Sequence, residues 1–129
     1  MPFAPRILVV DDEPTVRRLL EVVLSRHGYY VAVAGSGQHA MLQLRDGVFD
    51  VVILDISLQD VDGLQLVGHI RSEFPCCKVL AVSGFMAPLL HDMALDAGAD
   101  GALAKPIRAR KLQDAISRLL DPSWARRSR

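Results

Sequence analysis

Five polar residues each follow a short apolar run of the sequence, and their side chains are of the types that bind metal ions and phosphate. Asp11 and Asp12 come directly after the first of these runs, and Asp55, Ser83 and Lys105 come after three later ones. Three carboxylates that share a site repel one another, so they need a proton or a cation between them. Ligands that are all oxygen atoms suit a hard cation, and magnesium combines few carboxylates with water and phosphate oxygens.

The same residue types suit the transfer of a phosphoryl group. Asp55 is the natural nucleophile, because a carboxylate can form an aspartyl phosphate. Lys105 offers a compact positive charge to a phosphoryl oxygen or to Asp55 itself, and the Ser83 hydroxyl can donate to another phosphoryl oxygen. Positioning and charge neutralisation of this kind are most of what phosphoryl transfer requires.

Apolar runs of strand length alternate along the chain with segments of helical periodicity. Strands are predicted at Ile7–Val10, Tyr30–Ala34, Val51–Leu54, Val79–Val82 and Ala102–Ala104. Each is followed by a segment with an apolar stripe at helical spacing, and these stripes include Leu20, Met41, Val67, Leu90 and Ile116. Continuous apolar strands between amphipathic helices predict an α/β fold with a buried, five-stranded parallel sheet and five helices.

This fold would bring the five polar residues to one place. The carboxyl ends of parallel strands share one edge of the sheet, and ligands bind in the crevice outside it. Taken alone, an Asp after a strand is most often a helix cap or a turn residue. Five suitable residues on the same edge favour a shared site over five separate structural roles.

Length and composition limit the alternatives. The 129 residues are enough for one domain, half of them are apolar, and the net charge of zero argues against a general nucleic-acid binder. No apolar run reaches the roughly 20 residues of a membrane helix, and no signal peptide is visible, so a cytoplasmic protein is expected. Adjacent Cys76 and Cys77 are interpreted as two reduced thiols.

The charge is distributed unevenly, because eight of the fifteen Lys and Arg residues lie in the last 25 positions. We interpret this as a solvated last helix followed by a tail, and a basic docking face is the alternative. The expected domain covers residues 1–121, and residues 122–129 are expected to form a short, basic, flexible tail.

Four stretches of the sequence resemble the signatures of response-regulator receiver domains from two-component signalling. They are VVDDEP, VVILDISLQDVDGLQLV, VLAVSG and GALAKP, and the resemblance covers about residues 6–120. It implies the doubly wound, flavodoxin-like receiver fold, in which the strands of the sheet have the order 2-1-3-4-5. It also implies a phosphorylatable switch that assists its own phosphorylation and dephosphorylation but is not an enzyme in the usual sense.

The resemblance assigns a role to each candidate residue. Asp55 would be the phosphoacceptor, with Ser83 as the switch hydroxyl and Lys105 as the family's lysine. Magnesium would be held by Asp12 directly, by Asp11 through water, by Asp55 and by the main-chain carbonyl of Ser57. The Lys105–Pro106 bond resembles the family's cis peptide. The implied partners are a sensor histidine kinase or histidine phosphotransfer protein and a separate output protein, with no direct binding of nucleic acid and no membrane.

Two positions depart from the family's pattern. Gln59 stands where the family usually has Pro, which is expected to loosen the loop after the phosphoacceptor slightly. Ala102 stands where the family usually has Tyr or Phe, and there the ring changes rotamer as the switch hydroxyl moves. The second departure leaves open how a signal would be transmitted, but it removes no group needed for phosphorylation.

Three other kinds of site do not fit the sequence. A calcium loop around residues 60–63 would have Leu58 and His69 as its first and last ligands. A phosphatase of the haloacid-dehalogenase type would need a second Asp where Ser57 stands. A flavodoxin would need a hydroxyl-rich phosphate loop after the first strand, where this chain has three acids. The alternatives that remain are a phosphate-independent, receiver-like interaction module and an enzyme that acts on external phosphoesters.

Overall fold

Strands and helices alternate throughout residues 4–121, the part of the chain that the computed structural model describes. The strands are β1 (Arg6–Val10), β2 (Tyr30–Ala34), β3 (Val51–Asp55), β4 (Lys78–Ser83) and β5 (Gly101–Ala104). The helices are α1 (Pro14–Arg26), α2 (Gly37–Asp46), α3 (Gly63–Glu73), α4 (Pro88–Ala97) and α5 (Ala109–Leu120). All five predicted strands are present, and their observed ends differ from the predicted ones by no more than one residue.

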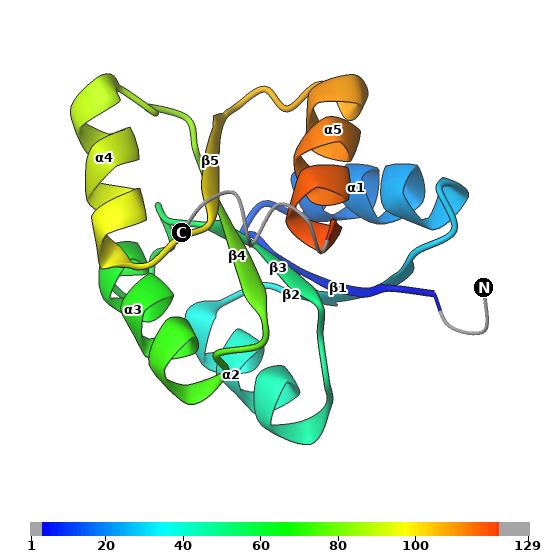
Figure 1. Cartoon of the computed structure of the whole chain (residues 1–129), viewed down its shortest axis with the longest axis horizontal. Coiled ribbons are helices and arrows are strands. Elements are labelled where there is room, and N and C mark those ends of the chain that lie inside the picture. Colours follow the sequence, from blue (N-terminus) through cyan, green and yellow to red (C-terminus); the bar gives the residue numbers. More distant parts are fainter. Residues whose placement is uncertain (1–3, 122–129) are drawn as a thin grey trace.

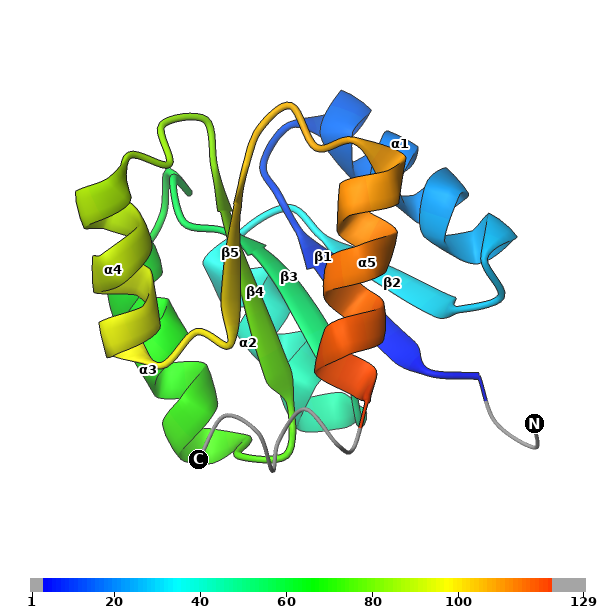
Figure 2. The ribbon, with the colours of Figure 1, turned by 45° about the horizontal axis from the view of Figure 1, so that its top comes forward.

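The five strands form a single parallel sheet in the order β2-β1-β3-β4-β5, as expected (Figure 1). Helices α1 and α5 cover one face of this sheet, and α2, α3 and α4 cover the other (Figure 2). β3 is the central strand, and all five of its residues are buried. The carboxyl end of β3 therefore lies in the middle of the sheet edge, between the ends of β1 and β4.

The hydrophobic core is divided by the sheet into two clusters. Successive side chains of a strand point to opposite faces, so Ile7 and Val9 pack with α1 and α5 while Leu8 and Val10 pack with α2 and α3. Each helix presents an apolar stripe to its own cluster, as its periodicity predicts. Burial on both faces explains why the strands read as continuous apolar runs.

Local signals set the helix ends. α1 and α4 begin with proline at their first turn, where the missing N–H has no helical partner. The side chain of Asp62 caps α3 by accepting hydrogen bonds from Leu64 N and Gln65 N. Gly28 has a φ angle of 87° just beyond α1, a left-handed conformation that favours glycine and turns the chain toward β2.

The predicted basic tail, residues 122–129, lies outside the described residues. Within residues 4–121 no helix is long and apolar enough to cross a membrane. Cys76 and Cys77 are both free thiols, in agreement with the sequence-based interpretation.

Candidate functional site

In residues 4–121 the buried polar side chains are those of Asp11, Asp55 and Ser83, and all three lie at the same sheet edge. Their exposed fractions are 2%, 4% and 2%. Burial of polar groups is costly unless they are paired. The buried polar side chains are therefore concentrated at the carboxyl edge of the sheet, which is the edge that the sequence indicated.

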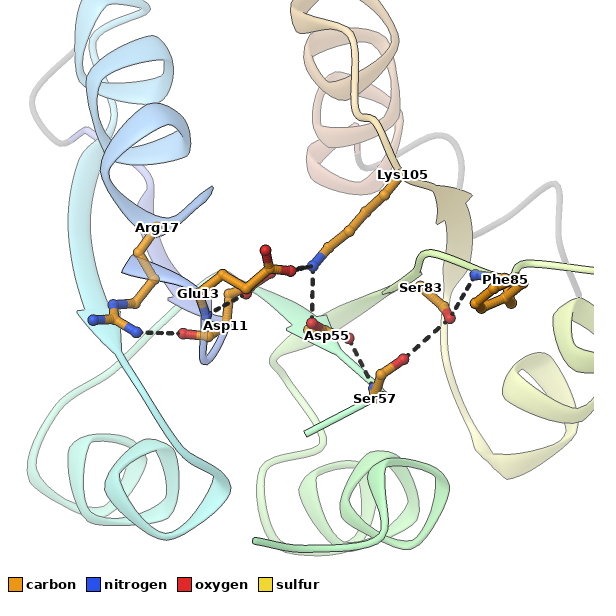
Figure 3. Close-up of polar contacts among 8 residues, drawn as sticks. All are labelled: Asp11, Glu13, Arg17, Asp55, Ser57, Ser83, Phe85 and Lys105. Atoms are coloured by element: carbon orange, nitrogen blue, oxygen red, sulfur yellow. Dashed lines mark hydrogen bonds and ion pairs between the residues drawn. The ribbon is translucent and has the colours of Figure 1, made fainter. Parts of the chain in front are cut away.

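The end of β1 is tied to its surroundings through Asp11. Its N–H donates to Ala34 O at the end of β2, and its carboxylate accepts a hydrogen bond of 2.9 Å from Glu13 N. Arg17, from the first turns of α1, donates a hydrogen bond of 2.7 Å from Nη1 to the main-chain oxygen of Asp11 (Figure 3). Hydrogen bonds to the backbone and to the side chain of Asp11 thus fix the start of the loop between β1 and α1.

Asp55 ends β3 and has a partner on each carboxylate oxygen. Ser57 N donates to Oδ1 at 2.8 Å, and Lys105 Nζ donates to Oδ2 at 2.9 Å. The backbone after Asp55 remains in register with β4, because Ile56 N donates to Val82 O. These bonds to both oxygens hold the Asp55 carboxylate in one orientation at the carboxyl edge of the sheet, where Asp11 also lies.

Lys105 reaches back over the edge from the end of β5. Its Nζ lies 2.7 Å from Asp11 Oδ2, 2.9 Å from Asp55 Oδ2 and 3.3 Å from Glu13 Oε1 (Figure 3). Burial disfavours the charged form of Lys105, but its hydrogen bonds with the two buried aspartates outweigh that effect and raise its pKa above the ordinary value. The Lys105–Pro106 bond is cis, as the resemblance implied.

Four acidic residues come together at this edge, and sequence reasoning named only three of them as candidates. Asp11, Asp12, Glu13 and Asp55 each have a ligand atom within 4.8 Å of the others. Burial raises the pKa of Asp11 above the ordinary carboxyl value, and the hydrogen bond from Lys105 offsets only part of that rise. Asp12 makes no hydrogen bond or ion pair with another described residue. An all-oxygen donor set of this kind fits magnesium.

The hydroxyl of Ser83, at the end of β4, belongs to a short chain of hydrogen bonds. It accepts a bond of 3.1 Å from Phe85 N and lies 3.2 Å from Ser57 Oγ (Figure 3). The Phe85 side chain itself is 88% exposed. Sequence reasoning gave Ser57 a role through its main-chain carbonyl, and nothing in the residue spacing indicated that its hydroxyl meets that of Ser83.

The loop after Asp55 is anchored by Asp60, although Gln59 replaces the usual proline. The Asp60 carboxylate accepts hydrogen bonds from Gly37 N at 3.0 Å and Gln38 N at 3.1 Å, at the beginning of α2. These bonds lower the pKa of Asp60 below the ordinary value. At Gly37 a Cβ atom would overlap the Val61 side chain, so glycine lets the loop approach the helix closely.

Ala102 lies on β5, next to a groove of about 240 Å³. The groove is bounded by β5 and by residues of α4 and α5, including His91, Leu95 and Ala115. No Phe, Tyr or Trp of the described residues lines it. The groove beside Ala102 is therefore not filled by the ring of a Phe, Tyr or Trp.

Comparison with known proteins identifies this arrangement. The sequence matches the family described as "Response regulator receiver domain" over residues 7–117. It is 35% identical over 114 residues to the transcriptional regulatory protein ZraR of Salmonella typhimurium, and the match covers 88% of this chain and 26% of that protein. The chain thus spans about a quarter of the length of this curated relative.

Solved structures agree with the sequence match. A response regulator protein, TrrA of Thermotoga maritima, in complex with Mg²⁺ and BeF, is 34% identical with a TM-score of 0.81, covering 90% of this chain and 99% of that one. The chemotaxis protein CheY4 of Vibrio cholerae is 27% identical with a TM-score of 0.86, covering 92% and 100%.

Proposed function

The chain belongs to the response-regulator receiver domains of two-component systems, and from that membership we propose that it is a phosphorylatable switch whose acceptor is Asp55. Receiver domains are phosphoacceptor signalling domains and in general not enzymes in the usual sense. The observation that carries the proposal is the position of Asp55. It ends the central strand, with Asp11 and Lys105 on one side and Ser83 beyond Ser57 on the other.

In the proposed transfer, an Asp55 oxygen attacks the phosphorus of a phosphohistidine on a partner protein. An O–P bond forms as the P–N bond breaks, and its electron pair stays on the ring nitrogen, which leaves as neutral imidazole when the other ring nitrogen carries the proton. The Lys105 ammonium group then pairs with a phosphoryl oxygen instead of the Asp55 carboxylate, and the Ser83 hydroxyl donates a hydrogen bond to another phosphoryl oxygen.

Magnesium is part of the proposal because the donor set fits it. When bound, the ion supplies positive charge to the phosphoryl oxygens. Asp12, which has no partner among the described residues, would be a direct ligand, and Asp11 would act through water. Asp55 and the main-chain carbonyl of Ser57 would be the remaining ligands that the protein supplies. A crystal structure of the relative TrrA contains Mg²⁺ with BeF, which supports this part of the proposal.

The proposed partners follow from the same membership. A sensor histidine kinase or a histidine phosphotransfer protein would supply the phosphoryl group, and a separate protein would receive the signal. We place this reaction in the cytoplasm and assign the receiver unit to residues 1–121. Direct binding of nucleic acid is not part of the proposal, since the similarity to the transcriptional regulator ZraR covers only 26% of that protein.

A labelling experiment tests the acceptor. Acetyl phosphate with magnesium should phosphorylate one residue of the wild-type protein, and mass spectrometry should locate it at Asp55. Omitting magnesium, or changing Asp55→Asn, should abolish the label while the circular dichroism spectrum stays the same, because the substitution is nearly isosteric. Undiminished labelling of Asp55→Asn would refute the assignment. A folded wild-type protein that neither takes label nor binds beryllofluoride would instead favour the phosphate-independent interaction module.

A further inference from the structure

The hydroxyls of Ser57 and Ser83 face one another across the gap between the β3–α3 loop and the end of β4 (Figure 3). Their Oγ atoms are 3.2 Å apart, and either can be the donor. The proposed transfer uses the main-chain carbonyl of Ser57 and the hydroxyl of Ser83. It gives no role to the hydroxyl of Ser57, so this contact needs its own explanation.

Burial limits what the Ser83 hydroxyl can do. Its side chain is almost completely inaccessible, and the N–H of Phe85 already donates to its oxygen. A hydroxyl has a single proton to donate, and a buried hydroxyl without a partner is costly. Among the described residues, the remaining partner for Ser83 is Ser57. The Ser57 side chain is exposed, so it can exchange this bond for one with water.

We propose that Ser57 is a positioning residue for the switch, because its hydroxyl holds that of Ser83 in the resting state. This role rests on the proposed function, in which Ser83 donates to a phosphoryl oxygen on Asp55. Because Phe85 N already donates to Ser83 Oγ, the proposal takes Ser83 as the donor to Ser57, and Ser83 cannot give its one proton to the phosphoryl group and to Ser57 at once. Ser57 therefore competes with the phosphoryl group for the same hydroxyl and sets how readily the active state forms.

The competition has a defined direction. A contact present only in the resting state shifts the equilibrium toward that state by its full differential strength. Removing the Ser57 hydroxyl should make the active state easier to reach. Removing it when Ser83 has no hydroxyl should change nothing, because the contact is already lost.

A double-mutant cycle measures this coupling. Wild type, Ser57→Ala, Ser83→Ala and the double variant are titrated with beryllofluoride in the presence of magnesium. Ser57→Ala should bind about threefold to tenfold more tightly than wild type, the range expected for one neutral hydrogen bond. In the Ser83→Ala background the same change should have no effect. Ser57→Thr, which keeps the hydroxyl, is the matched control and should behave as wild type.

Two further measurements separate this role from effects on the metal. Ser57→Ala keeps the main-chain carbonyl, so any change in its affinity for magnesium alone should be much smaller than its gain in affinity for beryllofluoride. In metal-free protein the Phe85 amide, which donates to Ser83 Oγ, should exchange with solvent faster in Ser57→Ala than in Ser57→Thr.

Each contrary outcome overturns a defined statement. The positioning role is wrong if Ser57→Ala binds beryllofluoride no better than wild type, if its gain persists in Ser83→Ala, or if magnesium alone shows the same gain. Wild-type protein that binds no beryllofluoride overturns the proposed function, and this role with it. Wild-type protein that binds normally but shows no coupling overturns the positioning role alone.

Discussion

Lys105 Nζ lies 2.9 Å from Asp55 Oδ2, so the lysine pairs with the carboxylate of the proposed acceptor in this structure. The same nitrogen contacts Asp11 Oδ2 at 2.7 Å. Lys105 is thus the cation that makes two buried carboxylates tolerable in the metal-free protein. Its charge serves the stability of the resting state as well as the proposed chemistry.

Replacing Lys105 should therefore destabilise the metal-free protein. Lys105→Ala leaves two buried carboxylates without their cation and should lower the free energy of unfolding by about 1–3 kcal/mol at neutral pH. Magnesium should still bind and restore most of this loss, while phosphorylation or its effect is impaired. Urea unfolding with and without magnesium checks the prediction, and exposed Lys111→Ala is the control. Equal losses in both variants would contradict it.

Asp12 and its neighbour Glu13 should differ in their importance for the metal. Asp12→Ala should weaken magnesium binding at least about tenfold, because it removes the proposed direct, charged ligand, which has no competing partner among the described residues. Glu13→Ala should have a smaller effect, since Glu13 is more exposed and its carboxylate contacts Lys105. A magnesium titration of each variant decides the point. Unchanged affinity in Asp12→Ala would overturn the assigned ligand roles.

The Asp60 anchor should give a measurable pH dependence. Its pKa is lower in the folded protein than in the unfolded chain, so its ionised form stabilises the fold. This stability is fully present above the ordinary carboxyl range of about pH 4 and is lost as pH falls through the lower folded value. Asp60→Asn should cost only about 0.3–0.5 kcal/mol at pH 7, because it removes a negative charge from the start of α2 at an exposed position, where solvent screens the interaction.

Denaturation of Asp60→Asn and wild type at several pH values tests this statement. The difference between them should begin to shrink below about pH 4, where Asp60 of the unfolded chain takes up a proton, and should be lost as pH falls through the lower pKa of the folded state. Asp96→Asn on exposed α4 is a control without this anchor. A difference that is constant from pH 7 to strongly acid pH would show that the carboxylate charge is not responsible.

Activation should affect the β4–α4 loop and α4 more than β5. Ala102 has only a methyl group, which cannot follow a movement of Ser83 as an aromatic ring can. With beryllofluoride and magnesium, changes in amide exchange should concentrate in residues 84–98 and be small at Gly101–Ala104. Ala102→Phe places a ring by the groove beside β5, so it should extend the changes to that strand. A dominant response at Gly101–Ala104 in wild type would contradict this route.

The two adjacent cysteines should react at very different rates. Cys76 is exposed, whereas burial, together with the nearby Asp50 and Asp100, raises the pKa of Cys77 to about 12. Because the thiolate is the reactive form, iodoacetamide should modify one thiol of the native protein quickly and the second only after denaturation. Mass spectrometry of Cys76→Ser checks the assignment. Rapid labelling of that variant in the native state would show that Cys77 is accessible.

The sequence predicted the sheet and its functional edge because both depend on short-range patterns. Apolar runs of strand length are enough to locate β3 and β4, and the polar residue that ends each run marks the shared edge. Asp55 and Ser83 could therefore be placed together without coordinates. The alternation of strands with helices predicted that the strands are parallel, whereas their order in the sheet came from the family resemblance.

Contacts between side chains that are distant in sequence could not be predicted in this way. The bonds from Asp60 to α2, and the pairing of the Ser57 and Ser83 hydroxyls, depend on how two loops approach each other in space. Glu13 was visible in the acidic run, but its contact with Lys105 depends on the side-chain path of a residue 92 positions away. Periodicity carries no information about such approaches.

Gly63 shows how a residue without reactive groups can be as intolerant of change as the acceptor itself. It opens α3, and a Cβ atom there would overlap the main chain of Ile56, the residue directly after Asp55. Any larger side chain would push on the backbone that orients the acceptor. In a saturation mutagenesis screen for signalling, Gly63 should score like a catalytic position. The loop can accept Gln59 where the family usually has proline, but a side chain at position 63 would displace the backbone next to Asp55.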